Sequence, residues 1–232
     1  FGLTEPNFGS NPSGMVTSCK KDGNDWIING NKMWITNGSI ADVAVVWAKD
    51  ENDIIRGFLI EKDTEGFTSS DLHGKFSLRA SITSELSMSD VRVPDSSRLP
   101  NIEGLKGPLS CLTQARYGIA WGMVGASVDC YNTALSYAKE RKQFSKPIAG
   151  YQLTQQKIAE MVTRITESQL LVFRLGRLKD ENKMTFQQVS LAKRNNCMMA
   201  RDVSKTAREM LGGNGITIDY SCLLYTSPSP RD

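Results

Sequence analysis

The hydrophobic pattern of the chain changes its period once, near residue 107. Before this point, short apolar runs alternate with polar residues, as in "SELSMSDVRVP" (residues 84–94), and such alternation is typical of half-buried β-strands. After it, long stretches place apolar residues three or four positions apart, which is typical of amphipathic helices. The chain is therefore predicted to be α+β by segments, with a small N-terminal β-barrel or sandwich followed by long helices.

Strand signals are clear in the first segment. "ADVAVVWAKD" (41–50) and "IIRGFLIEKD" (54–63) are short apolar runs separated by charged residues. "DWIINGNKMWITNG" (25–38) carries Asn29-Gly30 between two β-prone runs, a dipeptide that favours a hairpin turn. Prolines and glycines in "VPDSSRLPNIEGLKGP" mark a linker, so domains are expected over residues 1–98 and 99–220.

The second segment predicts three helices, each roughly 28–35 residues or about 40–50 Å long. The first is expected to end in "ERKQF" (140–144), because cations such as Arg141 and Lys142 suit a helix C-terminus. Long helices with short connections predict an antiparallel bundle, which three helices leave incomplete. The expected apolar positions are Leu153, Ile158, Met161, Val162 and Ile165 in the second helix and Val189, Ala192, Val203, Ala207 and Leu211 in the third.

Composition excludes several classes of function. A net charge of +3, without a basic stripe and interleaved aromatic residues, argues against a nucleic-acid partner. The best apolar run, Tyr117 to Val128, is too short to span a membrane. His73 is the only histidine and no cysteine lies in a CxxC pair, so no metal site is expected and a reducing compartment is favoured.

Three short motifs each allow a functional and a structural interpretation. "FGLTEPNFGSNPSG" at the start is a loop that can cradle a ring edge or a phosphate, or can be an ordinary surface loop. In "KMWITNG", Trp34 can stack on a planar ring and Thr36 can donate a hydrogen bond, although a half-buried Trp in a barrel wall is the simpler reading. "LGGNG" (211–215) lets a flat group approach the backbone, or is a helix cap.

The order and spacing of the motifs are more specific than any one of them. "TEPNFGS", "WITN", "GKFSLRAS", "QARYGIAWG", "ERKQFSKPI" and "MLGGNG" together resemble the middle and C-terminal domains of the acyl-CoA dehydrogenase family. Within it, "GKFSLRAS", "ARYGIAWG" and "GRLKD…VSLAKRNNC" are most similar to the glutaryl-CoA dehydrogenase branch. The resemblance runs from Phe1 to about Tyr220.

The resemblance implies an FAD cofactor, an acyl-CoA substrate, an electron-transfer flavoprotein as acceptor and a homotetramer in which dimers share flavin sites. Thr4 would face the pyrimidine edge of the flavin and Thr36 its N5 atom, and such hydrogen bonds tune a flavin. The implied cofactor contacts are Phe1, Leu3, Thr4, Ser10, Trp34, Ile35, Thr36, Arg141, Gln152, Glu209, Leu211, Gly212 and Gly213. The implied substrate contacts are Ser10, Leu109, Gln114 and Arg116.

The implied reaction is α,β-dehydrogenation of an acyl-CoA, and in the glutaryl-CoA branch loss of CO2 then gives crotonyl-CoA. A carboxylate must remove the α-proton. In one branch of the family this base precedes the Arg that Arg116 matches, but Ala115 stands there and cannot take a proton. The base is therefore expected beyond "LGGNG", and none of the residues of this chain is assigned as catalytic.

Both ends of the chain shape the expectation. It starts at "FGLTEP" without a Met, and residues 221–232, "SCLLYTSPSPRD", have no helical period and are expected to be a non-native tail. The chain is thus expected to be an inactive fragment of a longer enzyme, mitochondrial in a eukaryote or cytoplasmic in a bacterium. A non-catalytic flavin-binding relative and an acyl-CoA oxidase remain the alternatives.

Overall fold

The computed structural model describes residues 1–76 and 78–222. They form two compact units, one over residues 1–111 and one from residue 112 onward. The expected non-native tail lies outside the described residues, except for Ser221 and Cys222.

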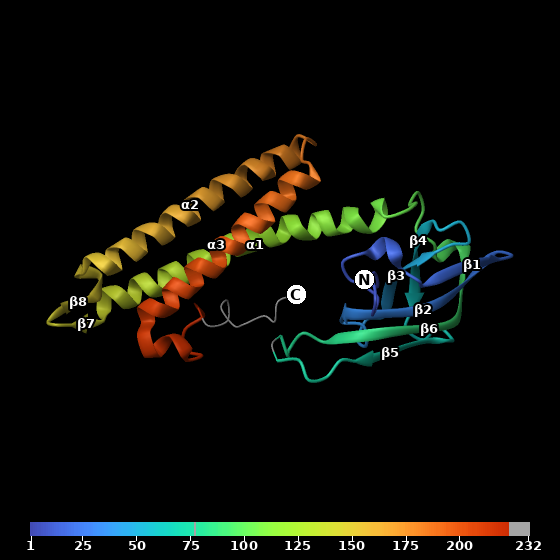
Figure 1. Ribbon diagram of the computed structural model, residues 1–232, viewed down its shortest axis with the longest axis horizontal. Helices are drawn as coiled ribbons and strands as arrows, with labels where there is room; N and C mark the ends of the chain where they lie inside the picture. Colours follow the sequence, from blue (N-terminus) through green and yellow to red (C-terminus); the bar gives the residue numbers. More distant parts are fainter. Residues whose placement is uncertain (77, 223–232) are drawn as a thin grey trace. The chain divides into compact units, whose positions relative to one another are not determined.

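The first unit is built on one six-stranded sheet with the strand order β4-β3-β1-β2-β6-β5 (Figure 1). Its β1 and β3 are parallel, and the other neighbouring strands are antiparallel. The α+β class is confirmed, whereas closure into a barrel is not, because β4 and β5 end the strand order of the described sheet. The strands are β1 (Ser18–Asp22), β2 (Asp25–Thr36), β3 (Val43–Lys49), β4 (Ile55–Glu61), β5 (Phe67–Asp71) and β6 (Thr83–Pro94).

The period-two pattern produces the core of this sheet. In β6 the side chains of Leu86 and Met88 are buried, and after an irregularity at Asp90 the alternation continues with Val91 and Val93 buried. One face of the sheet thus carries a continuous apolar cluster, as expected for a sheet with one covered face. The cluster consists of Cys19, Trp26, Ile28, Ile35, Ala44, Val46, Ala48, Phe58, Ile60, Phe67, Leu86, Met88, Val91 and Val93.

The hairpin predicted at Asn29-Gly30 is wrong, because both residues lie within the continuous strand β2. Gly30 adopts φ 142° at a register shift, and a Cβ there would lie 2.6 Å from Thr17 Oγ1. Asn29 exchanges two hydrogen bonds with Asp90 of the neighbouring strand. The dipeptide therefore forms a β-bulge, and the turn between β1 and β2 is made by residues 23–24.

The second unit contains three long helices, as predicted, and α2 and α3 pack against each other as consecutive neighbours (Figure 1). The helix α1 (Lys106–Glu140) begins within the first unit and continues into the second. The other two are α2 (Gln152–Asp180) and α3 (Phe186–Leu211). Two short strands, β7 (Lys142–Gln143) and β8 (Lys146–Pro147), connect α1 to α2. Short 3-10 helices lie at Pro12–Gly14 (η1), Asp95–Ser97 (η2), Ile148–Gly150 (η3) and Gly212–Ile216 (η4).

The first helix ends at the first residue of "ERKQF", the segment in which its sequence predicts the end. Its last residue is Glu140, and Arg141 N–H still bonds to Tyr137 O at 2.8 Å. Phe144 and Ser145 then take positive φ angles of 50° and 68° at the tip of the β7–β8 hairpin. Two successive residues in this conformation reverse the chain, which the cationic composition of the segment does not reveal.

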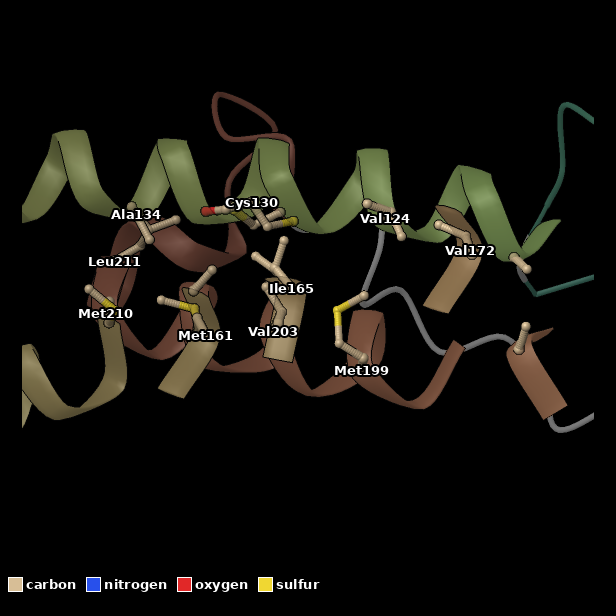
Figure 2. Close-up of a cluster of buried hydrophobic side chains, with 14 of the residues drawn as sticks. Val124, Cys130, Ala134, Met161, Ile165, Val172, Met199, Val203, Met210 and Leu211 are labelled. Carbon is tan, nitrogen blue, oxygen red and sulfur yellow. The ribbon is translucent and has the colours of Figure 1, made fainter. Parts of the chain in front are cut away.

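The three helices meet in one apolar core (Figure 2). The apolar positions predicted for α3 are all buried, but the stripe predicted for α2 is partly wrong, since Leu153 is 78% and Val162 41% exposed. The buried positions of α2 alternate in steps of four and three, as in a coiled-coil seam, and the exposed pair falls outside this repeat. The buried residues of α2 are Met161, Ile165, Ser168, Val172 and Leu175.

A buried polar contact fixes the register of the helices within this core. Asn196 of α3 is fully buried, and its Nδ2 donates to the carbonyl of Ala120 on α1 at 2.8 Å.

At the start of α3, Thr185 and Gln188 form a reciprocal capping box, a motif that stabilises a helix by about 1 kcal/mol. Within the described part of the chain, the helices lack an apolar stretch long enough to cross a membrane.

Candidate functional site

The N-terminal loop (residues 1–17) is joined to the sheet by main-chain hydrogen bonds. Gly2 exchanges two of them with β3, at 2.6 and 3.1 Å. The carbonyl of Thr4 accepts a hydrogen bond of 2.9 Å from the N–H of Met33 in β2. Thr4 therefore lies beside the residue that precedes Trp34, although the sequence separates them widely.

A buried ion pair holds the same loop from inside. The Nζ atom of Lys32 lies 2.9 Å from Oε1 of Glu5, and the two side chains are 0% and 1% exposed. Burial alone would raise the pKa of Glu5, but hydrogen bonds from Thr17, Val16 and Lys32, with the Lys32 charge, hold this pKa below its ordinary value. Burial lowers the pKa of Lys32, and the hydrogen bond and charge of Glu5 partly offset that effect.

The end of β2 presents an exposed aromatic ring. A register shift between Lys32 and Ile35 marks a bulge, and within it Trp34 has φ 63° and is 58% exposed. A positive φ in a bulky residue costs about 1–3 kcal/mol and persists only where the surroundings impose it. Ile35 is buried, while Thr36 is exposed and pairs with Thr83 of β6. The bulge thus leaves Trp34 exposed directly after the residue that bonds to Thr4, and Thr36 is exposed two positions further along the strand.

The other predicted contacts of the loop differ in exposure. Phe1 packs edge-on against the buried Trp47, with ring centroids 5.8 Å apart, and Leu3 is buried. Ser10 is exposed, and a Cβ on the neighbouring Gly9 would meet no atom of the described chain within 4 Å. Phe1 and Leu3 therefore anchor the loop through their side chains, and Ser10 is accessible to a ligand.

In the second unit, which contains the long helices and is called the helical unit below, four predicted cofactor contacts line one cavity of about 520 Å³. They are Arg141, Leu211, Gly212 and Gly213, and the wall is completed by Tyr137, Gln143, Ile148, Met210 and Asn214. Gly212 has φ 59°, a conformation that favours glycine. Gly213 has no positive φ, and a Cβ there would meet nothing within 4 Å in the described chain, so its missing side chain leaves open space.

Two predicted cofactor contacts are absent from the residues that line this cavity. Gln152 is the exposed first residue of α2. The carboxylate of Glu209 pairs with Lys157 of α2 at 3.3 Å, and both side chains are about half exposed. The structure thus joins Glu209 to α2, and contact of either residue with a cofactor stays a prediction.

The three predicted substrate contacts of α1 fall in different surroundings. Leu109 is 40% exposed in the first unit. In the second unit, Gln114 Oε1 accepts a hydrogen bond of 2.9 Å from Lys179, whose ammonium also lies 4.1 Å from the ring centroid of Tyr117. Arg116 is half-buried. A substrate role for these residues stays a prediction.

Sequence reasoning missed the Glu5–Lys32 pair and the part of Tyr137 and Asn214 in the cavity wall. Asn214 donates to the hydroxyl of Tyr137 at 3.2 Å, which joins the turn after α3 to α1. A signal was present for the ion pair: Lys32 occupies an inward position of an alternating strand, where a charge needs a partner. Nothing local in the sequence identifies Glu5 as that partner.

The two units match two families of protein domains. Residues 1–91 match the acyl-CoA dehydrogenase middle domain, and residues 103–226 match the acyl-CoA dehydrogenase C-terminal domain. The first unit, with its sheet and exposed Trp34, thus corresponds to the middle domain of an oxidoreductase, and the second unit, with its long helices, corresponds to the C-terminal domain. The chain belongs to the acyl-CoA dehydrogenase family.

Known relatives agree with this family. The glutaryl-CoA dehydrogenase of Mycobacterium smegmatis in complex with FADH2 is 52% identical, with a TM-score of 0.93 over 97% of this chain and 58% of that one. A probable acyl-CoA dehydrogenase of Bacillus subtilis, YngJ, is 37% identical over 95% of this chain and 60% of its own length. The CarC subunit of the caffeyl-CoA reductase-Etf complex of Acetobacterium woodii is 33% identical over 95% of this chain and 59% of its own length. The chain therefore spans about three fifths of these relatives.

Proposed function

We propose that the full-length protein is an FAD-dependent dehydrogenase that oxidises an acyl-CoA thioester between its α and β carbons. The observation that carries this proposal is the position of Thr4 beside Met33, at the strand end where Trp34 and Thr36 are exposed. These are the residues to which the family resemblance assigns the flavin. Their proximity depends on the fold and is independent of the motif match.

The residues present fit an FAD. The exposed ring of Trp34 offers a flat apolar surface, and the Thr36 hydroxyl lies two residues further along the same strand. Gly9 and Gly213 have no atom of the described chain within 4 Å of their Cβ positions, so a ligand can approach the backbone closely at both. Arg141 supplies a cation that suits a phosphate group in the cavity of the helical unit.

In the proposed reaction, an α-proton passes to a carboxylate and a hydride leaves the β-carbon. Bound FAD supplies the two-electron acceptor for this hydride. Thr4 and Thr36 would hold the bound cofactor by hydrogen bonds, and the exposed ring of Trp34 would cover it and exclude water. Because Ala115 cannot take a proton, the base is a carboxylate of the full-length protein at another position.

Glutaryl-CoA is the proposed substrate, and oxidative decarboxylation to crotonyl-CoA the proposed overall reaction. The 52% identity to the glutaryl-CoA dehydrogenase of Mycobacterium smegmatis supports this choice. An electron-transfer flavoprotein is the proposed acceptor, in line with the name of the Acetobacterium complex.

A homotetramer is the proposed assembly. Large apolar side chains are exposed along the described helices, including Leu170 and Phe173 on α2 and Leu191 and Met198 on α3. Exposed apolar side chains in such number favour burial against another subunit.

The test uses the purified full-length protein. A visible flavin absorbance, with glutaryl-CoA reducing an electron-transfer flavoprotein and releasing CO2, is the expected result. Butyryl-CoA serves as the control substrate, since it lacks the carboxylate that is lost as CO2. Turnover that consumes oxygen instead would indicate an acyl-CoA oxidase, and bound flavin without turnover of any acyl-CoA would indicate a non-catalytic relative.

A further inference from the structure

The Glu5–Lys32 pair has no role in the proposed reaction, yet both residues are close in sequence to the predicted flavin contacts of the first unit, which contains the sheet and is called the sheet unit below. Glu5 directly follows Thr4 in the sequence, and Lys32 precedes Trp34 by two positions in β2. Both charged groups are almost completely enclosed, with exposures of 1% and 0%. They are therefore too deep to touch a ligand at the surface.

The hydrogen bonds of the pair join three segments. The carboxylate of Glu5 accepts from the N–H groups of Val16 and Thr17 at 2.7 and 3.0 Å, which ties the start of the N-terminal loop to its end. The ammonium of Lys32 donates to Glu5 at 2.9 Å and to the carbonyl of Leu3 at 3.3 Å, which ties the loop to β2. The loop is thus fixed to the strand immediately before the bulge that exposes Trp34.

Stability alone is a poor reason for this arrangement. Removing two charges from water is costly, and well-packed apolar residues in place of a buried ion pair are often neutral or stabilising. Charge-assisted hydrogen bonds do impose direction, which apolar packing does not. The pair therefore favours one position of the loop relative to the strand over neighbouring positions.

We propose that Glu5 and Lys32 are positioning residues for the flavin, which set Thr4 in register with Trp34 and Thr36. This inference rests on the proposed function, because it takes the surface formed by these three residues to be the flavin site. The pair acts through the loop and the strand, and it touches neither the cofactor nor the substrate.

The decisive variant is Glu5→Gln/Lys32→Met in the full-length protein, which removes both charges and leaves no unpaired ion. The matched control is Asp50→Asn/Arg56→Met. This second ion pair of the sheet unit has a 2.7 Å contact and exposures of 7% and 16%, and it lies in the β3–β4 hairpin. FAD affinity, the visible flavin spectrum, the flavin reduction potential and the melting temperature are measured for both variants.

The expected result is a folded Glu5→Gln/Lys32→Met variant that binds FAD about tenfold more weakly, because binding must then order a loop that the pair no longer holds in place. Its flavin spectrum and potential should shift, whereas the control should change only in melting temperature. A folded variant with the parent's affinity, spectrum and potential overturns the positioning role. Absence of FAD from the parent protein overturns the proposed function instead.

A second variant covers the case in which Met at position 32 prevents folding. Glu5→Gln/Lys32→Gln keeps two hydrogen-bonding side chains without charge, and the same weakening and spectral shift are expected from it. If both variants fail to fold while the control folds, the pair serves stability, and the positioning role is overturned.

Discussion

The N-terminal loop and the turn after α3 are both predicted to contact the cofactor, but they are held by opposite means. The loop is fixed by the buried charges of Glu5 and Lys32. The turn is fixed by the positive φ conformation of Gly212 and by one partly buried hydrogen bond, which Arg208 Nε donates to the carbonyl of Gly215 at 2.9 Å. The loop thus depends on a buried ion pair, whereas the turn depends on glycine conformation and a partly buried hydrogen bond from a charged side chain to an uncharged carbonyl.

The largest effect is expected from breaking the loop's ion pair on one side only. Glu5→Gln leaves the Lys32 ammonium buried without a counter-charge, which should lower the free energy of unfolding by about 3–5 kcal/mol. Denaturant unfolding of the full-length protein, followed by tryptophan fluorescence, measures the change. A loss under about 1 kcal/mol would show that water or rearrangement compensates the charge.

The turn should respond to an added methyl group. In Gly215→Ala the new Cβ would lie 2.4 Å from the carbonyl oxygen of Arg208, so we expect a loss of about 1–3 kcal/mol of stability. The control is Gly213→Ala, whose Cβ would meet no described atom within 4 Å and should change stability by less than about 0.5 kcal/mol. FAD affinity should nevertheless fall in Gly213→Ala, and equal affinity would show that no ligand approaches this glycine.

The charge of Glu5 predicts an acid-sensitive loop. Its pKa in the folded protein lies below the ordinary value of 4.5. The stabilising contribution is therefore complete above pH 4.5 and is lost as the pH falls from there through the folded-state pKa, because the unfolded chain binds the proton first. Unfolding free energies of the parent and Glu5→Gln, measured across this range, should converge at low pH, because a protonated Glu5 carries the same charge as Gln. If the two unfolding free energies changed in parallel with pH, the lowered pKa of Glu5 would not be the cause of the acid sensitivity.

A small effect on stability is expected from removing the exposed ring of Trp34. Trp34→Gly removes a mostly exposed side chain and relieves its positive φ, while it makes the unfolded chain more flexible. Relief of the positive φ stabilises the folded protein and the more flexible unfolded chain destabilises it, so the free energy of unfolding should change by less than about 1 kcal/mol. The flavin spectrum of the same variant should shift, and an unshifted spectrum would remove Trp34 from the cofactor site.

Elements with a strong local pattern could be predicted and those that depend on remote contacts could not. The three helices follow from periodicity, and the strands over residues 43–49 and 55–61 follow from short apolar runs separated by charged residues. Asn29-Gly30 was misassigned because a bulge and a hairpin use the same residues, and only the pairing of Asn29 with Asp90 distinguishes them. In α2, Val162 was misassigned because a stripe drawn at 3.6 residues per turn is wider than the seam that is buried.

The candidate site shows the same division. The motif residues Thr4, Trp34 and Thr36 are recognisable in the sequence, because hydroxyls, aromatic rings and turn formers are chemical properties of single residues. Their proximity arises from the hydrogen bond between Met33 and Thr4, and the loop's register arises from a carboxylate and an ammonium that meet only after folding. Local periodicity and chemistry therefore account for the elements and the types of residue, whereas the geometry of the site depends on burial and pairing between distant segments, which no local pattern encodes.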